Sequence, residues 1–207
     1  MSQEPQYDVL VVGAGNAALT AALAALDEGA KVGVLEKAPK ADRGGNSMFT
    51  GHMRFAYNNV QELVPLMKNP TDEELARIDK LLPHHTEDEL TEMIMRVTDY
   101  RSDQEMLAVH VAESYKTVRW LASKGHTFVP NFGPRAQFVL SMDGGGHASQ
   151  ERNFKYVTEG GGMIHYDTSA TELLQDKTGK VIGVKVLGPN GFEEVYARSV
   201  VLACGGF

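Results

Sequence analysis

Short apolar runs and a longer alanine-rich run alternate at the start of the chain. Residues 7–12 form a short, mostly apolar run rich in valine and leucine that ends at a glycine, which is typical of a strand buried on both faces. Over residues 16–28 the composition changes to alanine and leucine, which favour a helix, and Gly29 follows where a helix end is expected. Residues 31–36 return to a strand pattern. The pattern therefore predicts a βαβ unit within a parallel sheet.

The uncharged stretch of residues 9–26 is almost long enough to cross a bilayer. Gly13, Gly15 and Asn16 lie in its middle, acidic residues close both of its ends, and no lysine or arginine precedes it as in a signal peptide. We therefore expect two buried elements, a strand and a helix, and no membrane span.

The middle of the chain has the pattern of helices. Thr71, Thr86 and Ser102 are each followed three positions later by a glutamate, which is the spacing of a capping box at a helix start. The third helix is expected over residues 103–124, with Gly125 just past its end. Its apolar stripe is expected to contain Met106, Val109, Ala112, Val118 and Leu121.

Glycine-rich turns divide the last part of the chain. Apolar and polar residues alternate on both sides of a Gly-Pro-Asn-Gly turn, which predicts a β-hairpin. We expect a loop over residues 130–146, a short helix over 148–158 and a strand over 163–167. The two hairpin strands are expected over residues 181–186 and 192–197, and a last buried strand over 199–203. Cys204 follows the last run and is expected to be buried with it.

The composition is that of a soluble globular protein with one large domain or slightly more. The 207 residues carry 27 acidic and 20 basic side chains, a net charge of -7. Without a basic cluster, this balance argues against nucleic acid as the partner. The single cysteine excludes a disulfide scaffold and fits a reducing cytoplasm. No metal site is expected, because His84 and His85 lack a third ligand at useful spacing.

The strongest local signal is the first glycine turn, residues 13–15, between the predicted strand and helix. Gly13 permits a tight turn, and Gly15 lets the backbone approach a pyrophosphate held by the helix N-terminus. Ala18 occupies the position of the third glycine in this fingerprint. Glu36 closes the second strand about 20 residues later, where a carboxylate bonds a ribose diol. The sequence predicts dinucleotide binding, and the carboxylate disfavours NADP.

A second glycine turn, Gly44 and Gly45, follows the second strand and is itself followed by Asn46 and Ser47. Such a turn brings further backbone donors and a short polar side chain toward a nucleotide, which a plain NAD domain does not need. A flexible surface turn explains the same residues equally well. The residues alone therefore leave NAD and FAD open.

The chain resembles the FAD-binding flavoproteins of the fumarate reductase and succinate dehydrogenase class. The resemblance rests on residues 8–36, the second glycine turn, the stretch 165–197 and the final run 200–207. Within that class, three features look most like tricarballylate dehydrogenases. They are Thr50 and Arg54 after the Gly-Gly-Asn-Ser segment, the helix that ends with residues 119–121, and the glycine triple 144–146 followed by residues 166–168. The implied fold is α/β: a Rossmann-like parallel-sheet FAD-binding domain with an added β-hairpin and an inserted helical segment.

The resemblance implies roles for particular residues. The first glycine turn would hold the FAD pyrophosphate, Glu36 the adenosine ribose, and the backbone of Ala170 the adenine. The full set of implied cofactor-binding residues is Gly13, Gly15, Asn16, Ala17, Glu36, Lys37, Gly44, Gly45, Asn46, Ser47, Gly51, His52, Ala170, Ala203 and Gly205.

The resemblance also bears on how FAD is held. In membrane-bound members a histidine of the second glycine segment bonds covalently to the flavin, and the matching position here is Asn46. Dissociable, non-covalent FAD is therefore expected. Attachment through His52, where relatives often have glycine, is the alternative.

Relatives continue well beyond the Gly-Gly-Phe at residue 207, so the chain is expected to be partial, with the catalytic acid and base outside it. The implied domains are residues 1–54 and 151–207 for FAD and 55–150 for helices and the start of a substrate cap. The implied reaction is oxidation of a CH–CH bond of a small carboxylic acid, tricarballylate to cis-aconitate, with an unidentified electron acceptor.

Other functions of the same chain stay open. A fumarate-type reduction and a steroid-type dehydrogenation use related chemistry, and an NAD-dependent dehydrogenase or a fragment that binds FAD without turnover are further alternatives. Arg54 and Arg135 are candidates to pair with substrate carboxylates. His147 is a candidate to cap a helix or to contact an anionic substrate.

Overall fold

The computed structural model describes residues 4–81, 85–132 and 138–206, which form two compact units. The first unit runs up to Thr50 and resumes at Gln150, and the second comprises Gly51–Ser149. No described helix combines the length and the apolar surface needed to cross a membrane.

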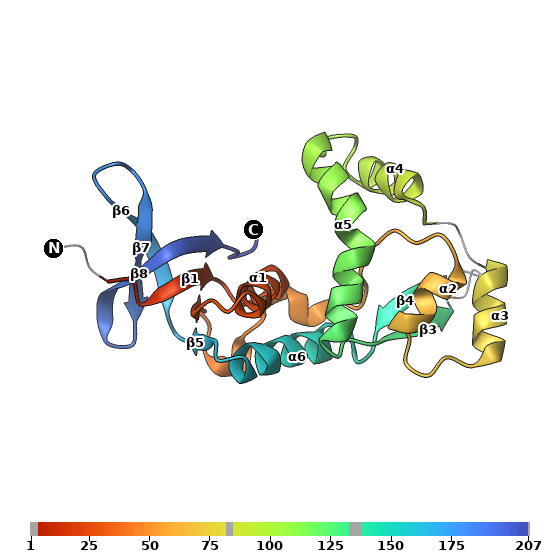
Figure 1. Cartoon of the computed structure of the whole chain (residues 1–207), viewed down its shortest axis with the longest axis horizontal. Helices are drawn as coiled ribbons and strands as arrows, with labels where there is room; N and C mark the ends of the chain where they lie inside the picture. The colour runs from red at the N-terminus through yellow and green to blue at the C-terminus, as the bar shows by residue number, and fades with distance from the viewer. Residues whose placement is uncertain (1–3, 82–84, 133–137, 207) are drawn as a thin grey trace. The chain divides into compact units, whose positions relative to one another are not determined.

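The first unit is built on a six-stranded sheet in the order β5-β2-β1-β8-β7-β6. Figure 1 labels β1, β5, β6, β7 and β8 of this sheet. Strands β5, β2, β1 and β8 are parallel, whereas β7 and β6 continue the sheet antiparallel. The bounds of the six strands are β1 Tyr7–Val12, β2 Val32–Leu35, β5 Met163–His165, β6 Ser169–Gln175, β7 Val181–Gly188 and β8 Gly191–Leu202. The predicted α/β class is confirmed.

The βαβ unit forms as its pattern predicts. Helix α1, Asn16–Asp27, follows β1 and buries Ala18, Leu19, Ala22 and Leu23, because alanines at this spacing let the helix lie close to the sheet. Gly29 follows the helix with a φ of 77°. The uncharged stretch is therefore a strand and a helix, as expected. Two short 3₁₀ helices, η1 Lys40–Asp42 and η2 Gly45–Phe49, also belong to this unit. The later helix α6, Gly145–Glu159, belongs to it from Gln150 onward.

Two strands expected to be separate form one. The second hairpin strand and the predicted last strand make up the continuous β8, which pairs with β7 through its first part and with β1 through its second. The Gly188–Gly191 hairpin turn is confirmed. The end of β8 is half-buried or exposed rather than buried, and Cys204 beyond it is exposed, which corrects both predictions. One face of this segment borders an open cleft, so packing does not enclose it.

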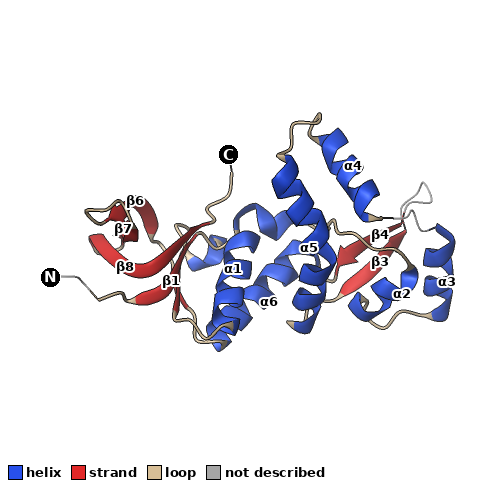
Figure 2. Cartoon of the chain, turned by 45° about the horizontal axis from the view of Figure 1, so that its top comes forward, coloured by secondary structure: helices blue, strands red, loops and turns tan. Residues whose placement is uncertain are grey.

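The second unit is mainly helical (Figure 2). Its elements are α2 Val60–Leu63, η3 Val64–Leu66, α3 Asp72–Leu81, α4 Glu87–Val97, α5 Gln104–Ser123, β3 Phe128–Phe132 and β4 Phe138–Met142. Capping boxes at Thr71 and Thr86 are confirmed by reciprocal hydrogen bonds with Glu74 and Glu89. The third cap is Asp103 rather than Ser102, because the Asp103 carboxylate accepts the Met106 N–H at 2.9 Å.

Three further predictions for this part of the chain were wrong, one of them only in part. Residues 130–146 include strands β3 and β4, which pair antiparallel, instead of a loop. The predicted stripe of α5 is right for Val118 and Leu121 but wrong for Ala112, Met106 and Val109, the last two of which are 73% and 65% exposed. The buried residues of α5 are Leu107, Val111, Ser114, Val118 and Leu121. Helix α6 begins at Gly145, so His147 is an exposed residue of its first turn instead of a cap.

A contact across the sheet explains why β2 contains Gly33. A side chain there would place its Cβ 2.8–2.9 Å from three ring atoms of Tyr7, which reaches over β2. The Tyr7 hydroxyl oxygen lies 2.7 Å from Nε2 of His165 in β5. Burial raises the pKa of this phenol, which stays protonated at neutral pH. Gly33 thus allows β1 and β5 to be linked across the strand between them.

We predict that Gly33→Ala destabilises the protein by about 1–3 kcal/mol, because the added carbon must displace the Tyr7 ring. Urea unfolding followed by circular dichroism measures the change. The control is Gly188→Ala, whose nearest neighbour, Thr168 Oγ1, lies at an ordinary 3.7 Å. Equal unfolding midpoints for the two variants would contradict the prediction.

Candidate functional site

A cleft of about 730 Å³ opens at the carboxyl ends of β1, β2 and β8, which Val12, Leu35 and Leu202 mark. In open parallel sheets this edge is where ligands bind, and the volume is within the range of small-molecule sites. We call it the sheet-edge cleft. Of the predicted site residues, those that line it are Gly13, Gly15, Asn16, Ala17, Glu36, Lys37, Gly44, Gly45, Asn46, Ser47, Ala170, Ala203 and Gly205.

The first glycine turn is fixed by a close approach of backbone. Gly13 has a φ of 102°, and a Cβ there would lie 2.5 Å from the carbonyl oxygen of Ala203. The Gly13 N–H donates to the Leu35 carbonyl at 2.7 Å. Gly13 is therefore required by the fold itself. Gly15 has an ordinary φ of -80°, and a Cβ there would come no nearer than 3.4 Å to Ser47 Oγ.

The N-terminus of α1 faces this cleft without a capping side chain from Gly15 or an acidic residue in its first turn. Within the described part of the chain, Ser47 Oγ approaches it and accepts the Asn16 N–H at 3.0 Å. The N–H groups and dipole of a helix N-terminus attract anions. This end of the cleft therefore suits a phosphate group.

Glu36 is buried, with 7% of its surface exposed, and its carboxylate is held by backbone. One oxygen accepts the Ala14 N–H at 2.9 Å and the other the Ala38 N–H at 2.8 Å. Each carboxylate oxygen has capacity for a second hydrogen bond. Because Glu36 also lines the cleft, its fixed oxygens are suited to accept from the hydroxyls of a sugar.

The second glycine turn lies against the first. The Gly44 carbonyl oxygen is 3.7 Å from the position of a Gly15 Cβ, and Gly44 itself has a φ of 95°. A Cβ at Gly44 would come within 2.7 Å of the Met48 side chain. The two turns therefore form one wall of backbone along the cleft.

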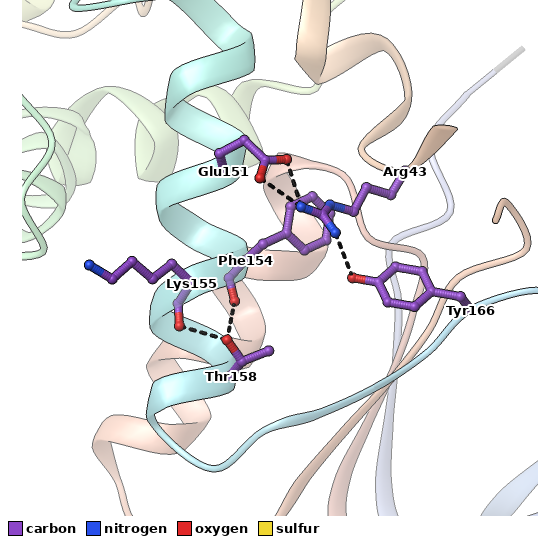
Figure 3. Close-up of polar contacts among 6 residues, drawn as sticks. All are labelled: Arg43, Glu151, Phe154, Lys155, Thr158 and Tyr166. Carbon is purple, nitrogen blue, oxygen red and sulfur yellow. Dashed lines mark hydrogen bonds and ion pairs between the residues drawn. The ribbon is translucent and has the colours of Figure 1, made fainter. Parts of the chain in front are cut away.

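The structure reveals a role for Arg43 that the sequence analysis missed. Its Nη2 lies 2.8 and 2.6 Å from the two carboxylate oxygens of Glu151 in α6, and its Nη1 donates to the Tyr166 hydroxyl at 3.4 Å (Figure 3). Burial acts to lower the pKa of this guanidinium, but the hydrogen bond to Glu151 and its negative charge raise it overall. Spacing offers no signal for this pair because its members are 108 positions apart.

Gln150 is a second residue that spacing does not reveal. It is 1% exposed, and its Nε2 donates to Oδ1 of Asn16 at 3.2 Å. The contact ties α6 to the first residue of α1. Further lining of the cleft comes from β6, including Ala170, and from the residues after β8, including Cys204.

Several candidates lie elsewhere. Gly51, His52, Arg54 and His147 belong to the second unit, where His52 Nδ1 is 3.2 Å from Ser141 Oγ. His84 and Arg135 lie outside the described residues. In the part of the chain that is described, no three histidine, cysteine, aspartate or glutamate side chains cluster as metal ligands.

The cleft fits a dinucleotide on the chemistry of its groups. Two glycine turns and a helix N-terminus with no acidic residue in its first turn suit a diphosphate, and a fixed carboxylate suits a ribose diol. No cationic side chain is needed for the diphosphate in such a site.

Comparison with known proteins finds several reductases among the similar proteins. A fumarate reductase (cytochrome) of Shewanella frigidimarina is 29% identical over 97% of this chain and 33% of the relative. An NADH:acrylate oxidoreductase of Vibrio harveyi is 27% identical over 99% of this chain and 25% of the relative. The chain thus spans between a quarter and a third of the length of these relatives.

The fold has matching solved structures. The open conformation of a flavocytochrome c3 fumarate reductase superposes with a TM-score of 0.76 at 25% identity, over 98% of this chain and 34% of that one. The family model described as "FAD binding domain" matches residues 8–207. Nearly the whole sequence, including both glycine turns and Glu36, is covered by that match, and the chain belongs to the family of FAD-binding domains.

Proposed function

We propose that the sheet-edge cleft binds FAD for a flavin-dependent oxidoreductase that acts on a CH–CH bond of a small carboxylic acid. One observation carries the proposal: the two glycine turns and the carboxylate of Glu36 converge on one cleft at the carboxyl ends of the parallel strands. The relatives named for fumarate and acrylate support the reaction class.

The proposed roles combine the resemblance with the geometry of the cleft. The N–H groups at the start of α1 bind the diphosphate, with Gly15 leaving space for it. Glu36 accepts from the adenosine ribose, and the β6 wall around Ala170 borders the adenine. On the resemblance, residues 44–47, Gly51 and His52 are proposed to serve the flavin end of the cofactor.

Hydride transfer is the chemistry that a bound flavin supplies, and this chain contributes binding, orientation and exclusion of water. Oxidation of tricarballylate to cis-aconitate removes a hydride and a neighbouring proton. The side chain that takes the proton is not assigned among the 207 residues. The segments 1–54 and 151–207 are proposed to bind FAD, and 55–150 to begin a substrate cap. Tricarballylate remains the specific substrate proposed, on the resemblance of the second glycine segment and Arg54.

We expect FAD to be held without a covalent bond, because Asn46 offers no nucleophile at the position of the attached histidine. Acid precipitation of the purified full-length protein should therefore leave yellow flavin in the supernatant. Yellow colour retained in the pellet would contradict this expectation. In that case His52→Ala tests the alternative attachment site.

Gly15→Val should abolish FAD binding while leaving the fold intact. The position has an ordinary φ, and a Cβ meets its nearest protein atom at 3.4 Å, so the added bulk acts mainly on a ligand. Gly13 and Glu36 are poorer choices, because their backbone contacts also hold the fold together. Fluorescence titration with FAD measures affinity, and circular dichroism checks folding. A folded variant that binds FAD as tightly as the unsubstituted protein would place the diphosphate elsewhere.

The substrate proposal is tested with the full-length protein and an artificial dye, since the natural electron acceptor is unidentified. Bleaching of an oxidised dye that depends on tricarballylate is the expected result. A reduced viologen supplied with fumarate or acrylate tests the reverse direction. Reduction of fumarate without oxidation of tricarballylate would assign the protein to fumarate-type chemistry, and FAD binding without any turnover would favour the binding-only alternative.

A further inference from the structure

Helix α6 contacts both glycine turns through two consecutive residues. Gln150 donates to the side chain of Asn16 beside the first turn, and Glu151 pairs with Arg43, which directly precedes the second. The helix thus supports the wall of the cleft from behind. This arrangement is independent of any local sequence motif, because α6 lies more than 100 positions from both turns.

Arg43 is enclosed by groups that suit a guanidinium. Its side chain is 14% exposed, its central carbon lies 4.3 Å from the ring centroid of Phe154, and Glu151 and Tyr166 contact its two terminal nitrogens (Figure 3). A lysine carries one compact charge and could not make the planar contact and both polar contacts together. The site is therefore specific for arginine.

The position of Arg43 determines where the second glycine turn lies. Gly44 follows it with a left-handed φ, and Ser47 then reaches the N-terminus of α1, where its Oγ accepts the Asn16 N–H. Residues 43–47 are thus held at one end by an ion pair and at the other by this hydrogen bond. The segment between the ion pair and this hydrogen bond lines the cleft.

We propose that Arg43, held by Glu151, is a positioning residue for FAD: it fixes residues 44–47 against the start of α1 in the geometry that receives the diphosphate. Arg43 is not among the described residues that line the cleft, so it acts through the turn and not by touching the cofactor. The inference rests on the proposed function, because it assigns a role within the proposed FAD site. A merely structural tie between loop and helix would change stability alone.

Glu151→Gln keeps the shape of the side chain and removes its charge, and Arg43→Lys keeps the charge and removes the planar contacts. Each should weaken FAD affinity of the full-length protein by about tenfold, the loss typical of a hydrogen bond to a charged group. The matched control is Glu159→Gln on the same helix, whose contact with Lys155 is long, 3.8 Å, and exposed. It should leave FAD affinity unchanged.

Hydrogen exchange of the flavin-free protein supplies a readout that does not depend on FAD. The amides of residues 44–48 and of Asn16 should exchange faster in Glu151→Gln than in the unsubstituted protein or the control. Should Glu151→Gln fail to fold, Tyr166→Phe removes only one contact of Arg43 and is expected to show the same two effects, smaller in size.

Faster exchange together with weaker FAD binding would support the proposal. Unchanged exchange would overturn it, and so would faster exchange with unchanged FAD affinity, since the order of the turn would then not matter to the cofactor. Absence of FAD binding by the unsubstituted protein has a different meaning, because it would overturn the proposed function itself.

Discussion

The approach of Gly13 to Ala203 is the constraint on which the cleft depends. The Ala203 N–H donates to the Val12 carbonyl at 2.9 Å, so the end of β8 is bonded to the end of β1. Gly13, which follows Val12, must then turn with a φ of 102° and without a side chain, because any Cβ would collide with the Ala203 carbonyl. One backbone contact thus joins the ends of β1 and β8 and places the first glycine turn at the sheet-edge cleft.

Backbone N–H groups hold the negative charge of Glu36 in this cleft, and a helix N-terminus supplies its positive potential. Both oxygens of Glu36 are held by N–H groups, which are stronger partners for a carboxylate than for a neutral acceptor. At the start of α1 the positive end of the helix is left without an acidic residue and receives only a hydroxyl from Ser47. The two regions therefore offer opposite preferences, an acceptor for hydroxyls beside a binding site for an anion.

The parts predictable from sequence are those whose contacts are local. The βαβ unit and the Thr86 capping box depend on neighbours a few residues away, and both formed as predicted. The predicted stripe of α5 was partly wrong because several faces of that helix carry apolar residues. Packing against the rest of its unit determines that Leu107 is buried and Met106 exposed. The pair of Arg43 and Glu151 could not be predicted, since spacing carries no information about contacts between such distant segments.

The second glycine turn shows how the structure resolves a question that its residues leave open. In a flexible surface turn the glycines would face open space, as Gly45 does. Gly44 instead has a left-handed φ of 95°, which disfavours any side chain, and Arg43 before it packs against Phe154 of α6. The second turn is thus held on the α6 side and lies beside the first turn, which is the arrangement that the proposed binding of one diphosphate by both turns requires.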